Sequence, residues 1–447
     1  MSRYIFPGYL VLLFCLPLPF AAVYVWGWAF FAGLSCSLLA AQLLQPTSNS
    51  VRSNAPISNV IPTYSYPVLL PLCFVPLVII LQWIWAFASS AAGFDIGFGS
   101  GAHHDLYLEA LQSIGLCSFF TLTLLLLNTR DRVKSAIWTV VLAAGFQALY
   151  GSLMVMSGLE YGFFSKKWAY LQKATGTFVN RNHLAGYLEM SLALGIGFLL
   201  ASSTRYSGNW QQRMRQFIEM LLSPKVIMRL TLAIMVIGLV MTRSRMGNTA
   251  FFASLMITGG LALLLMRNKS KSTTILLTSL LLIDVAIVGT FFGVEKVADR
   301  LQGSSIEKES RDEVSRDTFN MWLENPILGT GAGSFKYTYP SHKSEDVTAT
   351  RLYDYAHNDY LEFLAEFGVI VYLALVAAVL ISLYWAIQAM RLRRNSLQQG
   401  MGFAATMGII AILIHSSVDF NLQIPANAFM FVFLLAIACI ARWSKLR

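Results

Sequence analysis

The chain has 447 residues, of which 56% are apolar and 13% charged, and its formal net charge is +10. Soluble domains carry about 25% charged residues, so this composition excludes a soluble globular enzyme and a disordered chain. A membrane-crossing helix needs about 20 mostly apolar residues, so about twelve of them would use roughly half of the chain. The composition predicts an all-α polytopic membrane protein with one sizeable extramembrane segment.

The apolar stretches predict about twelve transmembrane helices. The apolar character of the first 44 residues continues without a cleavage site, so we expect two spans joined by a tight turn near residues 23–27 rather than a signal peptide. The other spans are expected at residues 66–89, 107–128, 135–157, 184–202, 226–242, 248–266, 274–294, 368–390, 401–418 and 425–442.

Basic residues are concentrated in short loops between these spans. If twelve spans alternate from a cytoplasmic N-terminus, all of these loops fall on the cytoplasmic side, as the positive-inside rule expects. This distribution argues against nucleic-acid binding and places both termini in the cytoplasm. The loops are residues 130–134, 205–225, 267–271, 391–394 and 442–447.

Three polar segments then face outward, at about 158–183, 242–247 and 295–367. The last is too long for a simple connector. We therefore expect a single transmembrane domain over residues 1–447 with a periplasmic loop subdomain, residues 295–367, inserted between the ninth and tenth spans.

Arginines stand at the start of two outward-facing helices. Arg181 lies between Asn180 and His183, where a guanidinium and free backbone N–H groups would bind an anion. Arg243 and Arg245 occupy an outer turn against the positive-inside trend, and a bound anion would explain that exception. The alternative is that these arginines only contact lipid headgroups. Residues two apart diverge on a helix, so at most one of this pair is expected to point into a site.

The long outer segment contains a glycine-rich stretch and an isolated histidine. Residues 325–334 lack the strand–helix context of a dinucleotide loop, which favours a tight turn. His357 is surrounded by Asn, Asp and Tyr side chains just before a span, so structural and catalytic roles both stay open. His103-His104-Asp105, in another outer loop, is a weaker candidate for binding a metal, because adjacent histidines diverge on a helix, and a solvated loop is the simpler expectation.

At these residues the sequence resembles the O-antigen ligase and O-antigen polymerase superfamily of bacterial inner-membrane glycosyltransferases. The resemblance extends from about Thr175 to Pro425. The motifs occur in a fixed order, on alternating spans with a long outer loop between them. They are Arg-Asn-His-Leu-Ala-Gly-Tyr at 181–187, Ser-Arg-Met-Gly at 244–247, Asn-Pro-Ile-Leu-Gly-Thr-Gly at 325–331 and His-Asn-Asp-Tyr-Leu-Glu at 357–362.

The resemblance implies a GT-C-like fold in a Gram-negative inner membrane, with the active site at the periplasmic face. It implies a glycosyltransferase without metal or cofactor, which takes its glycan from undecaprenyl diphosphate. By position, His357 corresponds to the family's essential loop histidine, and Arg181 and Arg245 correspond to arginines assigned to the lipid diphosphate. Arg243 is an additional arginine beside that motif.

The chemistry of these residues agrees with transfer from a lipid diphosphate. Breaking the sugar–phosphate bond leaves negative charge, which fixed guanidinium groups stabilise, and losing one such group typically costs about 3 kcal/mol. His357 would accept the proton of the acceptor hydroxyl. Attack opposite the leaving group predicts inversion, and Asp354, Asn358 or Glu362 would orient the imidazole. The residues expected to bind substrate are Arg243, Asn180, His183, Asn358, Glu362 and Arg316.

Two acceptors fit the family. A ligase transfers the glycan to the lipid A–core oligosaccharide, whereas a polymerase transfers it to another lipid-linked repeat unit. A polymerase holds two lipid diphosphates, so it needs more outward basic residues, and Arg243 with Lys166, Lys167 and Lys173 fits that reading. These lysines equally fit the phosphorylated core of the ligase acceptor, and of the two acceptors we favour that of the ligase.

Two more distant alternatives follow from other residues. Glu189 and Asp284 lie deep in spans, as in a transporter or a lipid-linked glycan flippase. The polar clusters, however, lie at one membrane face, which favours an enzyme. Asp354, His357 and Asp359 would suit a divalent metal, although the arginines already supply positive charge.

Overall fold

The computed structural model describes residues 2–45, 60–91, 103–163, 165–202, 224–266, 305–347 and 353–446, together with isolated positions between 274 and 282. Within these residues every long element is an α-helix. The two strands, β1 (Tyr161–Gly162) and β2 (Ser165–Lys166), form one short antiparallel hairpin. The prediction of an all-α membrane fold is confirmed.

Nine helices of the described residues are long and apolar enough to cross a membrane, and α1 and α8 add two shorter apolar helices. The multi-span prediction is therefore confirmed for nine to eleven spans. The span expected at 274–294, including Asp284, lies almost wholly outside the described residues. The apolar helices are α1 (Ser2–Cys15), α2 (Val25–Leu43), α3 (Tyr66–Ala91), α4 (His103–Leu126), α5 (Arg130–Ser157), α6 (Arg181–Ala201), α8 (Pro224–Met241), α9 (Arg245–Leu265), α14 (Asp359–Leu392), α15 (Ser396–His415) and α16 (Pro425–Trp443).

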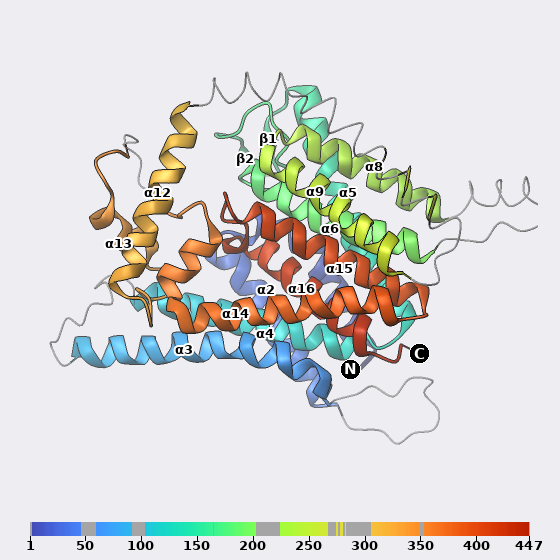
Figure 1. Cartoon of the computed structure of the whole chain (residues 1–447), viewed down its shortest axis with the longest axis horizontal. Helices are drawn as coiled ribbons and strands as arrows, with labels where there is room; N and C mark the ends of the chain where they lie inside the picture. The colour runs from blue at the N-terminus through green and yellow to red at the C-terminus, as the bar shows by residue number, and fades with distance from the viewer. Residues whose placement is uncertain are drawn as a thin grey trace, which may run out of the picture.

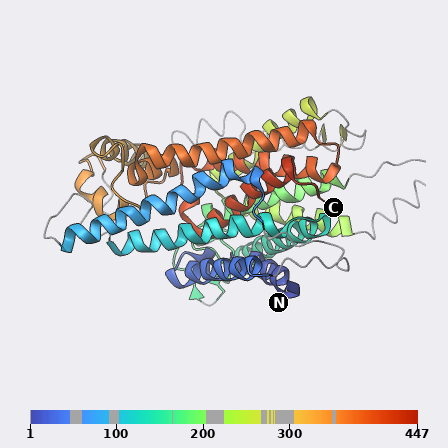
Figure 2. The same cartoon turned by 90° about the horizontal axis from the view of Figure 1, so that it is seen from below.

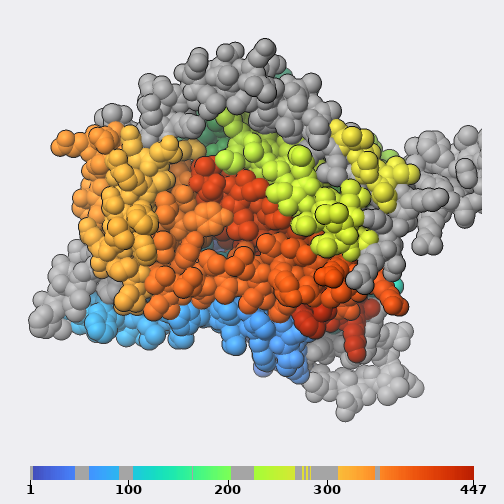
Figure 3. Space-filling view, in the orientation of Figure 1, coloured from blue at the N-terminus to red at the C-terminus, as the bar shows by residue number. Residues whose placement is uncertain are grey.

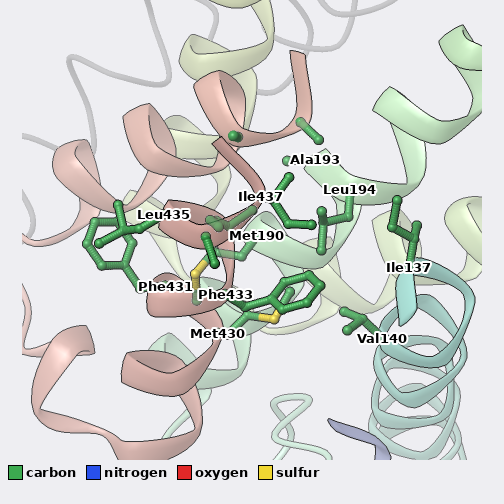
Figure 4. Packing of buried hydrophobic residues seen from close by; sticks show 14 of the residues in the cluster. Ile137, Val140, Met190, Ala193, Leu194, Met430, Phe431, Phe433, Leu435 and Ile437 are labelled. Carbon is green, nitrogen blue, oxygen red and sulfur yellow. The ribbon is translucent and has the colours of Figure 1, made fainter. Parts of the chain in front are cut away.

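Three helices form the centre of the bundle. α6, α15 and α16 are buried along most of their length, whereas α2, α3 and α14 expose most of theirs (Figure 1). A helix that is apolar all round is expected in the interior of a membrane protein. Side chains from α5, α6 and α16, among them Ile137, Leu194 and Phe433, meet in this core (Figure 4).

Small residues bring α6 and α15 into close contact. A Cβ at Gly197 would collide with the carbonyl oxygen of Gly400, and the reverse is also true. Such contacts between small residues are the usual means by which membrane helices approach closely. The contact fixes α15, and therefore its last residue His415, against α6.

The polar segment between α9 and α14 forms a lobe at one end of the bundle, comprising α12 (Ser305–Glu324), α13 (Phe335–His342) and the residues up to 358 that the structure describes (Figures 1 and 3). Side-chain contacts help to attach the lobe to the bundle. Lys336 Nζ lies 2.9 Å from Asp105 Oδ2, Arg311 Nη1 donates to the Val418 carbonyl at 3.0 Å, and Gln82 Nε2 donates to the Leu328 carbonyl at 2.9 Å. The expected solvated loop at Asp105 is wrong, because this residue lies in the first turn of α4 and its side chain is only 15% exposed.

The glycine-rich stretch is a tight turn, as predicted, and it docks on a break in α14. Gly368 interrupts the helix with φ +68 and ψ 173, and Gly329 faces it with φ +69. A Cβ at either glycine would collide with the backbone of the other segment. Backbone hydrogen bonds from Thr330 to Ala365 and from Val369 to Pro326, both 2.9 Å, join the two segments.

Basic residues gather at the end of the bundle opposite the lobe. α4 and α14 both start beside the lobe and run away from it, so Arg132 and Arg393, which follow them, lie at the far end. There Arg393 Nη2 donates to the Ser444 carbonyl at 3.2 Å. The two chain termini lie toward the same end (Figure 2).

Candidate active site

Asn180 positions Arg181 at the start of α6. The Asn180 side chain caps the helix by accepting the Asn182 N–H at 2.9 Å, so Arg181 becomes the first helical residue. The Arg181 guanidinium donates through Nη1 to the Arg243 carbonyl at 3.2 Å and lies 5.9 Å from the centre of the Tyr170 ring. The first two arginine-containing motifs are therefore adjacent in space.

The turn before α9 presents Arg243 and Arg245. Ser244 caps α9 by accepting the Gly247 N–H at 3.2 Å, which makes Arg245 the first helical residue, while Arg243 precedes the helix with φ +53. Both arginines are exposed. Because only one of them is helical, the expected divergence of residues two apart on a helix does not apply here.

The loop that carries His357 is held in shape from both sides. His357 adopts φ +54, a left-handed conformation that is uncommon for residues with a Cβ. On one side the Glu362 carboxylate accepts the Ala356 N–H at 2.7 Å. On the other side Asn358 caps α14 by accepting the N–H groups of Tyr360 and Leu361.

Asp419 joins the histidine loop to the start of α6. Its Oδ1 lies 3.6 Å from Nδ1 of His357 and 3.9 Å from Nε2 of His183. Its Oδ2 accepts a hydrogen bond from Asn182 Nδ2 at 2.5 Å. The 3.6 Å contact with His357 is an ion-pair distance and exceeds hydrogen-bond length, and it leaves Nε2 of His357 as the ring atom that does not face the carboxylate.

The electrostatic environment keeps Asp419 ionised. The residue is only 1% exposed, and burial alone would raise the pKa of its carboxyl group. Contact with His357 and the charges of His183 and His415 act in the opposite direction and hold this pKa well below its usual range. A buried carboxylate that stays charged is suited to stabilise a neighbouring imidazolium.

One aromatic ring packs between the two histidines. The Phe420 ring centre lies 4.8 Å from that of His357 and 4.6 Å from that of His183, both in edge-to-face geometry. Tyr355 stacks on the same ring at 4.3 Å. These contacts fix the two imidazoles relative to the loop that carries Asp419.

The structure brings several of the predicted site residues together and leaves others apart. His183 and His357 both face Asp419 in the loop of residues 416–424. Arg181, which Asn180 places at the start of α6, contacts the turn that carries Arg243. Arg316 lies in the lobe and donates to Ser344 Oγ at 2.9 Å and Asp346 Oδ2 at 3.3 Å. Glu362 is 1% exposed, and Asn358 Nδ2 donates to the Ser417 carbonyl at 3.1 Å. In this structure these last three side chains support the protein's own backbone or lobe.

Asp419 was missed by sequence reasoning. It is a lone acidic residue between two apolar spans, with no Lys or Arg near it in the sequence. The available signal was the polar character of the short connector, which contains Ser416, Ser417, Asp419, Asn421 and Gln423 on the same side of the membrane as the other motifs.

A cavity of about 350 Å³ lies behind the first turn of α14, between α3, α4, α14 and α16. Most of its lining is apolar, but one end carries polar side chains. There Asp359 Oδ2 accepts hydrogen bonds from Ser416 Oγ at 2.6 Å and from the Leu422 N–H at 3.1 Å. The polar lining residues are Glu109, Gln112, Ser113, Asp359, Ser416 and Gln423.

The described residues contain no group of three or more His, Cys, Asp or Glu side chains placed to hold a metal ion. His357 instead faces Asp419, while Asp359 is hydrogen-bonded to Ser416 and Leu422.

Part of the chain matches a known protein family. No curated protein matches the chain. Residues 230–376, which run from α8 through the lobe into α14, match the Wzy_C family, described as O-antigen ligase. Three of the four motifs that carried the resemblance lie inside this stretch, whereas the Arg181 motif precedes it. The chain therefore contains an O-antigen ligase family domain, Wzy_C, over residues 230–376.

Proposed function

We propose that this protein is a metal-independent, inverting glycosyltransferase that moves a glycan from undecaprenyl diphosphate to an acceptor hydroxyl at the periplasmic face of a Gram-negative inner membrane. The observation that carries the proposal is the cluster in which Asp419 links His357 to the helix start that bears Arg181. The family match over residues 230–376 supports transfer of a lipid-linked glycan.

The cluster supplies the groups that such a reaction needs. The acceptor oxygen attacks the anomeric carbon opposite the diphosphate while Nε2 of His357 takes its proton, and Asp419 stabilises the resulting imidazolium. The bond between the anomeric carbon and the phosphate oxygen breaks, and its electron pair leaves with undecaprenyl diphosphate. Arg181 and Arg245, with Arg243 beside them, stabilise that charge.

The cavity behind α14 offers a place for hydrocarbon. Asp419 and Phe420 face the histidines, whereas Ser416, Leu422 and Gln423 of the same loop line the cavity. Carboxylates at its polar end disfavour a diphosphate there, so we assign the headgroup to the arginine side of the loop and an apolar lipid chain to the cavity.

The charge distribution supports a periplasmic site. Arg132, Arg393 and the termini lie at the end opposite the lobe, and the positive-inside rule assigns that end to the cytoplasm. The lobe, Arg181 and His357 then face the periplasm.

Among the two acceptors we propose lipid A–core, so that the enzyme is an O-antigen ligase. Lys167 Nζ lies 2.8 Å from Glu160 Oε2 and also donates to the carbonyl groups of Tyr170 and Lys173. This cation is therefore already engaged within the protein, so Lys167 does not distinguish a second diphosphate from a phosphorylated core. A disruption strain separates the acceptors: loss of a ligase strands long chains on undecaprenyl diphosphate, whereas loss of a polymerase leaves single repeats on the surface lipid.

The direct test is glycan transfer by the purified protein in liposomes that contain an undecaprenyl-diphosphate-linked glycan and lipid A–core. We expect transfer to persist in a chelator and to fall by about 10²–10⁴-fold in His357→Asn, because proton transfer to the imidazole is lost. Asparagine is chosen because it tolerates the left-handed backbone at this position.

The matched control is His342→Gln, which changes a lobe histidine that bonds Glu324 and the Thr338 carbonyl instead of Asp419. This variant should transfer at the wild-type rate. Undiminished transfer by His357→Asn would contradict the proposed mechanism.

A further inference from the structure

Glu189 and His415 form a buried pair inside the bundle. Oε1 of Glu189 on α6 lies 2.9 Å from Nδ1 of His415, the last residue of α15. Both side chains are 0% exposed. Because burying ionisable groups inside a membrane protein is costly, such a pair calls for an explanation beyond packing.

His415 leads directly into the histidine arm of the site, by which we mean residues 416–424 together with His357. Ser416, the next residue, donates to Asp359 Oδ2 at 2.6 Å, and Asp419 faces His357 at 3.6 Å. The position of His415 therefore sets where this loop leaves α15.

Glu189 also lies against the arginine arm, by which we mean the turn and first helical residues 242–247. A Cβ built at Gly247 would lie 3.1 Å from Glu189 Oε1 and would also press on Ala185 of α6. Gly247 is the third residue of α9, and Arg245 is the first. One carboxylate oxygen thus contacts the partner that leads into the histidine arm and lies beside the helix start that bears Arg245.

We propose that Glu189, acting through His415, is a positioning residue that holds the arginine arm and the histidine arm in register for glycan transfer. This inference rests on the proposed function. Displacing reacting groups by about 1 Å can cost about 10²-fold in rate. The arginines themselves remain when Glu189 is changed, so the expected defect is in kcat, with little change in KM for the lipid-linked donor.

The test compares two conservative variants of Glu189 in the full-length protein in liposomes. Glu189→Gln keeps an oxygen that accepts from Nδ1 of His415, so we expect at least half of the wild-type kcat. Glu189→Asp withdraws the carboxylate by one methylene, so we expect kcat per folded protein to fall at least tenfold with KM within twofold. Thr406→Val is the matched control, because it removes a different buried polar group of α15, the hydroxyl that donates to the Gly402 carbonyl, and it should keep the wild-type kcat.

If Glu189→Asp does not fold, His415→Asn and His415→Leu take its place. The asparagine amide reaches the position of Nδ1 and should retain transfer, whereas leucine should lose it at least tenfold. Equal kcat values per folded protein for the two variants compared would overturn the inference, and so would a defect confined to KM. A wild-type protein that transfers no glycan would instead overturn the proposed function, and this inference with it.

Discussion

Asp419 faces two histidines, His357 and His183. Because only His357 takes a proton in the proposed mechanism, we expect removal of Asp419 to act mainly through His357. We predict that Asp419→Ala lowers kcat by up to about 10²–10⁴-fold, the contribution of the proton transfer that it supports. In a protein that already carries His357→Asn, the same change should have little further effect, because the two residues act as one unit. Steady-state transfer by the four proteins of this cycle measures the coupling.

The control for that cycle is Asp346→Ala. Asp346 is an exposed acid that contacts Arg316 in the lobe, and its loss should not affect transfer. If Asp419→Ala and His357→Asn multiplied their separate effects, Asp419 would act independently of the imidazole.

At the scale of elements, the break in α14 couples the lobe to the membrane-spanning part. We predict that Gly368→Ala loosens the lobe, because the added Cβ would strain a left-handed backbone and collide with the Ile327 carbonyl. The expected results are faster cleavage of residues 305–347 in limited proteolysis and a lower transfer rate.

Gly260→Ala is the matched comparison within a helix. Gly260 lies in α9, where a Cβ would meet nothing within 4 Å. Alanine should be neutral or stabilising there by up to about 1 kcal/mol. If the lobe resists protease equally well in Gly368→Ala and in Gly260→Ala, then the close approach of Gly329 and Gly368 does not hold the lobe in place.

At the scale of the whole molecule, the lobe and the basic loops define opposite ends. We predict that a membrane-impermeant maleimide added to intact cells, with the outer membrane permeabilised, labels Ser341→Cys in the lobe but not Ser396→Cys at the start of α15. Both serines are exposed. Labelling only at Ser396→Cys would reverse the orientation and place the site in the cytoplasm.

The sequence predicted the spans of the described residues well because long apolar runs leave few alternatives to a membrane helix. It also placed Arg181 and His357 at or directly before the start of such a run, where the structure has them, and their roles in the site stay predictions. It did not predict Asp419 beside His357 or Lys336 beside Asp105. These pairs depend on how distant helices pack, and neither partner is marked by its neighbours along the chain.

The backbone at His357 has a consequence for the evolution of this protein. A residue with a Cβ held in that conformation costs about 1–3 kcal/mol, which glycine would not incur. Under the proposed function, selection for stability alone would favour glycine at position 357 and would remove the imidazole together with its activity. Keeping histidine there would then trade conformational stability for turnover.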